Sequence, residues 1–172
     1  LYKHYLSQFH IDPNKKIDEL SKGMKMKYCI ALALSHQAEL LILDEPTSGL
    51  DPVARDELLE VFQTLVEEGE VSILFSTHIT SDLEKCSDYI TFIQNGKLVV
   101  STTKDDLIDQ YRVVSGSKNN LDEVKEHLIS YKMNSLGFTG LIKTATIPYK
   151  SSLNYAQPTL DDIMIYYAKS EV

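Results

Sequence analysis

The spacing of apolar residues divides the first half of the chain into helices and strands. Apolar residues recur every three to four positions in three segments, which predicts amphipathic helices over residues 1–10, 22–37 and 53–68. The runs "LLIL" (40–43) and "VSILFSTH" (71–78) are predicted to be continuous apolar strands, the first of them buried on both faces as in a parallel sheet. The order strand, helix, strand predicts a right-handed βαβ unit.

The second half of the chain carries turn signals and weaker patterns. "YITFIQ" (89–94) and "KLVVST" (97–102) flank Asn95-Gly96, a pair typical of the tight turn of a β-hairpin. The polar stretch "SGSKNN" predicts a domain boundary, so that residues 1–114 form a first domain and residues 115–172 a small α+β extension. Further helices are predicted over residues 81–88, 104–111, 121–130 and 160–169, the last with Thr159 as its N-cap, and two strands over residues 137–147.

Composition narrows the class of protein. The 172 residues are 43% hydrophobic and 24% charged, the balance of an ordinary globular protein. A net charge of −8 leaves no basic surplus for binding nucleic acid. No apolar run approaches the roughly 20 residues of a membrane span, and no secretory signal opens the chain, so we expect a cytoplasmic protein. Cys29 lies in the apolar run "YCIALAL" and is predicted to be a buried thiol.

Two carboxylates directly follow the first predicted strand. Placing two charged groups at the end of a buried strand is energetically costly, which suggests that they bind a ligand or take part in catalysis. Asp44 and Glu45 end "LLILDE", and His78 ends the second strand. Because ligands collect at the carboxyl ends of parallel strands, we expect all three side chains to face one crevice. One acid would orient Mg²⁺, a second would polarise an attacking water, and the histidine would hold a terminal phosphate. The alternative, a solvated strand exit, would suit an isolated Asp-Glu-Pro but not this combined spacing.

Four motifs, taken together, are specific. "LSKGM" (20–24), "LLILDEP" (40–46), "TSGLD" (47–51) and "STH" (76–78) resemble the signature, Walker B, D-loop and switch-histidine motifs of ATP-binding-cassette (ABC) ATPases, in that family's order. The resemblance covers the first hundred residues. It implies an α/β fold, namely a partial P-loop NTPase nucleotide-binding domain with a parallel βαβ core, and it implies ATP and Mg²⁺ as ligands.

The resemblance also implies roles for the residues at the strand ends. Asp44 would help to hold Mg²⁺ through water, Glu45 would act as the general base on the attacking water, and His78 would contact the γ-phosphate. Removal of such a base typically costs about 10²–10⁴-fold in rate.

The signature and the D-loop would bind nucleotide across a dimer. A helix N-terminus carries roughly +0.5 charge and free N–H groups, and a glycine lets backbone approach an anion closely. The family commonly has Gly and Gln where Lys22 and Met24 stand, and the "LSKGM" form resembles the exporter-like branch of bacterial transporters. The implied nucleotide-binding residues are Ser21, Lys22, Gly23, Ser48, Gly49 and Asp51.

A phosphate-binding loop of the form G-x-x-x-x-G-K-[ST] is absent from the sequence. The single Gly-Lys pair, Gly96-Lys97, belongs to the predicted hairpin turn. We therefore expect that this chain alone neither binds ATP tightly nor hydrolyses it. Either the natural protein is longer, which the missing initiator Met favours, or the chain is a natural half-cassette. A half-cassette here means a nucleotide-binding domain that lacks the phosphate-binding loop and that pairs with a complete ATPase subunit.

The resemblance implies the ATPase subunit of a membrane transporter. Such a subunit would lie in the cytoplasm on the inner face of the cell membrane, paired with transmembrane permease subunits and with a second ATPase subunit. Two alternatives stay open. The first is a soluble ABC ATPase of DNA maintenance or translation, which the lack of basic clusters disfavours. The second is a non-catalytic regulatory half-cassette, in which Glu45 and His78 would be unneeded.

Overall fold

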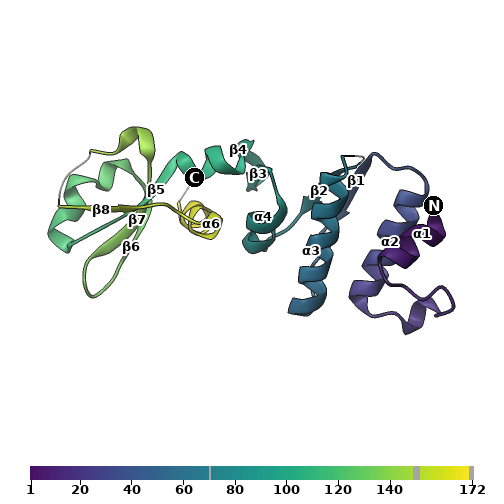
Figure 1. Ribbon diagram of the computed structural model, residues 1–172. Helices are drawn as coiled ribbons and strands as arrows, with labels where there is room; N and C mark the ends of the chain where they lie inside the picture. The colour runs from purple at the N-terminus through teal and green to yellow at the C-terminus, as the bar shows by residue number, and fades with distance from the viewer. Residues whose placement is uncertain (70, 149–151, 171–172) are drawn as a thin grey trace. The chain divides into compact units, whose positions relative to one another are not determined.

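The computed structural model describes residues 1–69, 71–148 and 152–170. The chain forms two compact units, Leu1–Cys86 (unit 1) and Ser87–Val172 (unit 2) (Figure 1). The predicted boundary after residue 114 falls within a strand of unit 2, and the assignment of residues 1–114 to a cassette domain stays a prediction.

The helices of unit 1 lie where the apolar spacing predicted them. Ser21 is the N-cap of the second helix, and its Oγ accepts the N–H of Met24 at 3.2 Å. The third helix begins at Pro52, whose fixed φ and missing N–H suit the first helical position. The helices are α1 (Tyr2–Gln8), α2 (Lys22–Ser35), α3 (Pro52–Glu67) and α4 (Thr80–Cys86), with a 3₁₀ turn over Ile17–Glu19.

The two apolar runs form a small parallel sheet, as predicted. β1 (Leu40–Asp44) pairs with β2 (Ser72–Ser76), and α3 connects them. One face of this sheet packs on α2 and α3, and Leu41 is buried there in one cluster with side chains of both helices. The sheet therefore covers one side of the core of unit 1.

The other face of the sheet is exposed, so the prediction that the first strand is buried on both faces is wrong. Leu40, Ile42 and Leu74 are 53%, 71% and 59% exposed. The apolar run of the first strand has no period of two, and so it predicts burial of both faces, whereas the described helices of unit 1 cover only one. Cys29 is also exposed, contrary to prediction, because it points away from the buried stripe of α2 that contains Ile30 and Leu34.

Unit 2 begins with the predicted hairpin. β3 (Tyr89–Gln94) pairs antiparallel with β4 (Lys97–Thr103). Asn95 and Gly96 have φ values of 50° and 73°, the left-handed conformation that this two-residue turn requires. Gly96-Lys97 is thus a turn and not part of a phosphate-binding loop. The helix α5 (Lys104–Asp109) follows.

The rest of unit 2 is a four-stranded antiparallel sheet with a C-terminal helix. The capping box of Thr159 and Asp162 starts this helix as predicted. The helix predicted over residues 121–130 is wrong: the buried Val124 has φ −131°, which breaks the segment into two 3₁₀ turns, and a strand follows. The strand order is β6 (Leu128–Met133), β7 (Phe138–Lys143), β5 (Tyr111–Gly116) and β8 (Asn154–Ala156), joined by 3₁₀ turns at Lys118–Glu123, Lys125–His127 and Thr144–Thr146, and the helix is α6 (Leu160–Lys169).

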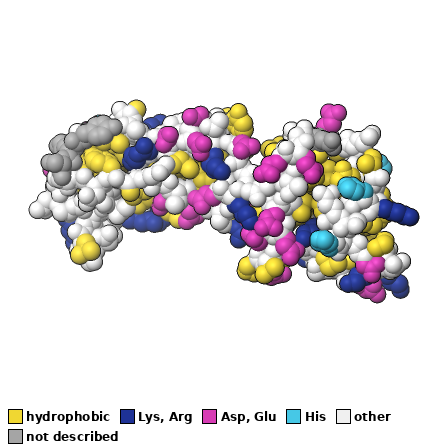
Figure 2. Space-filling view, in the orientation of Figure 1, with side chains coloured by type: hydrophobic (Ala, Val, Ile, Leu, Met, Phe, Trp, Pro, Cys, Tyr) yellow, Lys and Arg dark blue, Asp and Glu magenta, His cyan; other side chains and the backbone are white. Residues whose placement is uncertain are grey.

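The surface charge and the character of the helices are relevant to binding of nucleic acid or membrane. On the face in Figure 2, acidic and basic side chains are interspersed. Within residues 1–69, 71–148 and 152–170, no helix combines the length and the apolar character that crossing a bilayer demands.

Candidate active site

The carboxyl ends of β1 and β2 meet in register, and this places the predicted catalytic residues together. Asp44 lies opposite Ser76 at the end of the ladder. The Ser76 hydroxyl donates a hydrogen bond to Oδ1 of Asp44 at 2.5 Å. Asp44 is exposed at this strand end.

Glu45 leaves the strand in an unusual backbone conformation. Its φ is 45°, a left-handed value that non-glycine residues seldom adopt and that is frequent at functional sites. The Glu45 N–H still donates to the carbonyl of Ser76 at 3.1 Å, so the sheet ladder extends one residue past the strand. This conformation turns the carboxylate away from the strand direction and toward the loop after β2.

Glu45 and His78 form a direct pair. Oε1 of Glu45 lies 2.8 Å from Nδ1 of His78. The other oxygen, Oε2, is buried and has no hydrogen-bond partner among the residues that the structure describes. The histidine side chain is 73% exposed and the glutamate 34%, so the pair lies at a surface that a ligand can reach.

The N-terminus of α2 and the D-loop form a second group. Nζ of Lys22 donates to the carbonyl of Ser48 at 2.5 Å. Gly49 has φ 68°, and a Cβ there would lie 2.7 Å from the same Nζ. Gly23 is buried where α2 crosses α3, and a Cβ on it would lie 3.1 Å from Cβ of Ala54. The requirement for glycine at both positions therefore has a structural explanation that does not involve nucleotide.

Asp51 has a structural role as well. Its Oδ1 accepts the backbone N–H groups of Val53 and Ala54 at 3.0 Å each, which caps α3. Such a cap is typically worth about 1 kcal/mol. The predicted contact of Asp51 with a partner subunit stays a prediction, as do the predicted nucleotide contacts of Ser21, Lys22, Gly23, Ser48 and Gly49.

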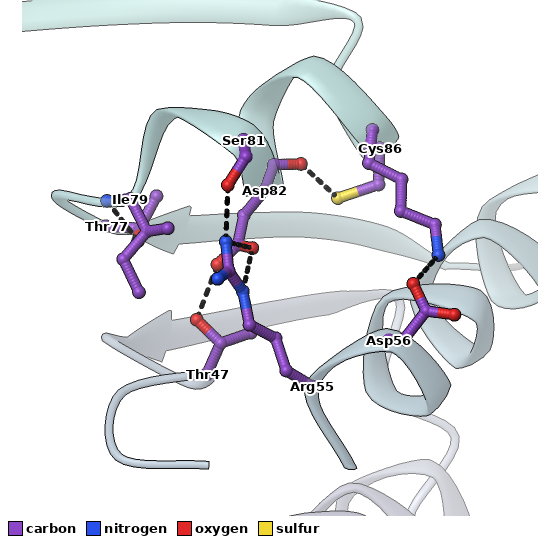
Figure 3. A network of polar contacts seen from close by, with 9 residues as sticks. Thr47, Arg55, Asp56, Thr77, Ile79, Ser81, Asp82 and Cys86 are labelled. Carbon is purple, nitrogen blue, oxygen red and sulfur yellow. Dashed lines mark hydrogen bonds and ion pairs between the residues drawn. The ribbon is translucent and has the colours of Figure 1, made fainter. Parts of the chain in front are cut away.

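Sequence reasoning missed three residues that hold this site. Ser76 binds both Asp44 and Glu45, and its polar side chain in an apolar strand was the available signal. Thr47 and Asp82 are 1% and 0% exposed and hydrogen-bonded to each other (Figure 3). Asp82 lies four residues after His78, in α4, and nothing in the sequence marks it as buried.

The donor set fits a metal that is shared with a ligand. Among the residues that the structure describes, no cluster of three or more His, Cys, Asp or Glu side chains could hold a metal ion alone. Asp44 offers one carboxylate. Mg²⁺ usually takes one or two carboxylates and fills its remaining positions with water and phosphate oxygens. One carboxylate is compatible with Mg²⁺ that is shared with a nucleotide, and the predicted role of Asp44 in holding Mg²⁺ stays a prediction.

The fold and the site together define a class of protein. A parallel strand pair carries adjacent carboxylates at the end of one strand and a histidine after the next, with a capped helix N-terminus and a D-loop nearby. This is the arrangement that the sequence motifs implied for an ABC-type ATPase. Residues 6–81, which include all four motifs, match the family described as "AAA domain, putative AbiEii toxin, Type IV TA system".

Comparison with curated proteins identifies the relatives within this class. The bacitracin transport ATP-binding protein BcrA of Bacillus licheniformis is 42% identical over 88 residues, which are 51% of this chain and 29% of that protein. The lantibiotic transport ATP-binding protein SrtF of Streptococcus pyogenes is 41% identical over 91 residues, which are 53% of this chain and 39% of that protein. The chain is therefore related to ABC transporter ATP-binding proteins over about half its length.

A solved structure supports the fold. The structure described as "An inward-facing conformation of a putative metal-chelate type ABC transporter" has a TM-score of 0.58 with this chain, at 19% sequence identity. The likeness covers 83% of this chain and 55% of that one. The mixed α/β fold with a small parallel sheet is thus shared with that structure. The curated relatives confirm the resemblance that the motifs carry, over about half of the chain.

Proposed function

We propose that this chain supplies the hydrolytic half of the nucleotide site of an ABC transporter ATPase, in a partial P-loop NTPase domain. The observation that carries the proposal is the Glu45–His78 pair, 2.8 Å apart at the carboxyl ends of two parallel strands. Neither residue contributes to a buried core, and Glu45 holds an unfavourable backbone conformation. A purely structural role accounts for neither feature.

The pair has the chemistry for attack of water on a phosphate anhydride. In this proposal Glu45 accepts a proton from water as the water attacks the γ-phosphate. His78 holds Glu45 through Nδ1 and has an exposed ring with which to contact the terminal phosphate. Asp44, oriented by Ser76, would hold Mg²⁺, which neutralises charge that develops on the phosphates.

The signature helix and the D-loop suit the second half of a dimeric site. The N-terminus of α2 combines free N–H groups with the charge of Lys22, and the Lys22–Ser48 hydrogen bond joins it to the D-loop. In this proposal a second ATPase subunit binds its nucleotide against this surface. Transmembrane permease subunits choose the substrate, and the assembly lies on the cytoplasmic face of the membrane.

The nucleotide also needs a phosphate-binding loop, and the 172 residues contain none. In our proposal that loop comes from polypeptide outside this sequence, within the same protein or in a partner. The chain by itself then shows no robust Mg-ATPase activity.

The test uses the native polypeptide, isolated from its own cells with an antibody raised against this chain. We expect Mg-ATPase activity, and we expect Glu45→Gln introduced at the chromosomal locus to lower it by about 10²-fold or more. Glu68→Gln is the matched control, since Glu68 is an exposed residue at the C-terminus of α3. Activity unchanged by Glu45→Gln would refute the catalytic role and favour a regulatory half-cassette.

A further inference from the structure

We propose that Asp82 is a positioning residue that acts through Thr47 to hold Glu45 against His78. The inference rests on the proposed function, because it assigns a task to the Glu45–His78 pair. Asp82 touches neither of these two residues in the contacts that the structure gives. Its effect therefore has to pass through the loops that carry them.

Asp82 lies at the centre of a polar network (Figure 3). Its Oδ2 accepts the hydroxyl of Thr47 at 2.6 Å. Its Oδ1 accepts Nε of Arg55 at 2.5 Å, and a terminal nitrogen of Arg55 donates to Oγ of Ser81 at 2.6 Å. These four residues come from three segments that are distant in sequence: the turn after β1, the start of α3 and the start of α4.

The burial of Asp82 means that its carboxylate depends on the donors of this network. The side chain is 0% exposed, and a carboxylate out of water is very unfavourable without a counter-charge and hydrogen bonds. Arg55, 28% exposed, provides the charge, and Thr47, 1% exposed, provides the remaining donor. Loss of the Thr47 hydroxyl would leave a buried carboxylate oxygen with one donor fewer, so the Thr47–Asp82 hydrogen bond favours this position of the loop.

The network closes a ring that includes the catalytic pair. On one side, Thr47 lies two residues after Glu45 and is separated from it by the fully buried Pro46. The Ser48 N–H donates back to the carbonyl of Glu45 at 3.0 Å, which makes the turn tight. A displacement of Thr47 is therefore passed directly to the backbone of Glu45.

The other side of the ring runs through α4. The Asp82 N–H donates to the carbonyl of Ile79 at 3.1 Å, and Ile79 is the neighbour of His78. The Ile79 N–H in turn donates to Oγ1 of Thr77 at 3.0 Å. Two loops that leave adjacent strands are thus joined twice, by the exposed Glu45–His78 pair and by the buried Thr47–Asp82 bond. The buried bond is the one that water does not compete for.

The test removes the Thr47 hydroxyl and measures hydrogen exchange by NMR in the full 172-residue chain. Thr47→Val keeps the volume, and Thr47→Ser keeps the hydroxyl. Thr64→Val is the matched control, because it removes a hydroxyl bonded to a backbone carbonyl on the exposed side of α3. In Thr47→Val we expect the amides of Glu45 and Ser48 to exchange about 10- to 100-fold faster, the range for loss of a hydrogen bond to a charged group.

The pattern of exchange separates positioning from general stability. The amides of Leu43 and Leu74, which point into the β1–β2 ladder, should change by less than about twofold, and Thr47→Ser and Thr64→Val should resemble the wild type. Equal acceleration of every amide in unit 1 would mean that Asp82 only stabilises the fold. No acceleration at Glu45 and Ser48 would mean that the ring does not hold the site. Either result overturns the proposal.

Two further measurements keep the test decisive. If Thr47→Val does not fold, Ser81→Ala removes one acceptor of Arg55 more gently, and we expect the same two amides to accelerate about 2- to 10-fold. In the native ATPase, Thr47→Val should lower kcat and leave KM for ATP unchanged, and Thr47→Ser should restore kcat. If the native protein has no ATPase activity, the proposed function fails, while the exchange pattern still decides whether Asp82 holds Glu45.

Discussion

The signature glycine Gly23 allows its structural and functional explanations to be separated by experiment. In Gly23→Ala the new Cβ would lie 3.1 Å from Cβ of Ala54, while carbon atoms pack best at about 3.5–4.0 Å. Ala54 is part of α3 and has no side-chain rotation that would move its Cβ away. The helices α2 and α3 must therefore separate by a few tenths of an ångström, and overpacking of this kind typically costs about 1–3 kcal/mol.

Helix propensity opposes this cost. Alanine is favoured over glycine by at most about 1 kcal/mol in a helix interior, and by less in the first turn where Gly23 lies. We therefore expect Gly23→Ala to destabilise unit 1 by about 1 kcal/mol. Ala54 also lies in a first turn, that of α3, so Ala54→Gly alone should cost less than about 1 kcal/mol through propensity. The double variant should be close to the wild type, because the clash is gone. The coupling energy is then between about 1 and 2 kcal/mol in magnitude.

The assay is urea unfolding of the full chain followed through NMR signals of Leu34 and Leu58, which are buried in unit 1. Signals specific to unit 1 are needed because two compact units need not unfold as one. If Gly23→Ala is neutral or stabilising, and the two substitutions are additive, the packing explanation is refuted. The remaining reason for a glycine here would be close approach of an anion to the backbone.

Two other predictions concern the exposed sheet face and unit 2. Ile42 is 71% exposed and should promote self-association of the chain, so Ile42→Lys should weaken self-association by about tenfold or more in analytical ultracentrifugation. Ile17 is 56% exposed but lies outside the sheet, and Ile17→Lys should leave self-association unchanged. Equal effects of the two substitutions would contradict a specific role of the exposed sheet face. Burial and the hydrogen bond with Tyr111 raise the pKa of Tyr167, so the free energy of unfolding of unit 2 should fall as pH rises above about 10, where the unfolded phenol ionises. Tyr167→Phe should flatten this dependence in urea titrations between pH 8 and 11, and an unchanged slope would contradict the assignment.

The helices of unit 1 and the hairpin of unit 2 could be predicted because their signals are local. Ser21, Pro52 and Asn95-Gly96 mark a cap, a helix start and a turn through their own stereochemistry, and each has the predicted role. The segment over residues 121–130 could not be predicted in this way. Its helical spacing is overridden by the burial of Val124 in the core of unit 2, which is a tertiary effect.

The sequence by itself determined which chemical groups the protein has and the order in which they occur. Asp44, Glu45 and His78 follow apolar strands, and strand ends in a parallel pair meet at one edge, so their proximity was predictable from the chain alone. The tertiary structure decided how these groups are held. It gave Glu45 its left-handed turn and placed Asp82 in a buried network with Thr47, because burial and counter-charge depend on contacts between segments that no local pattern encodes.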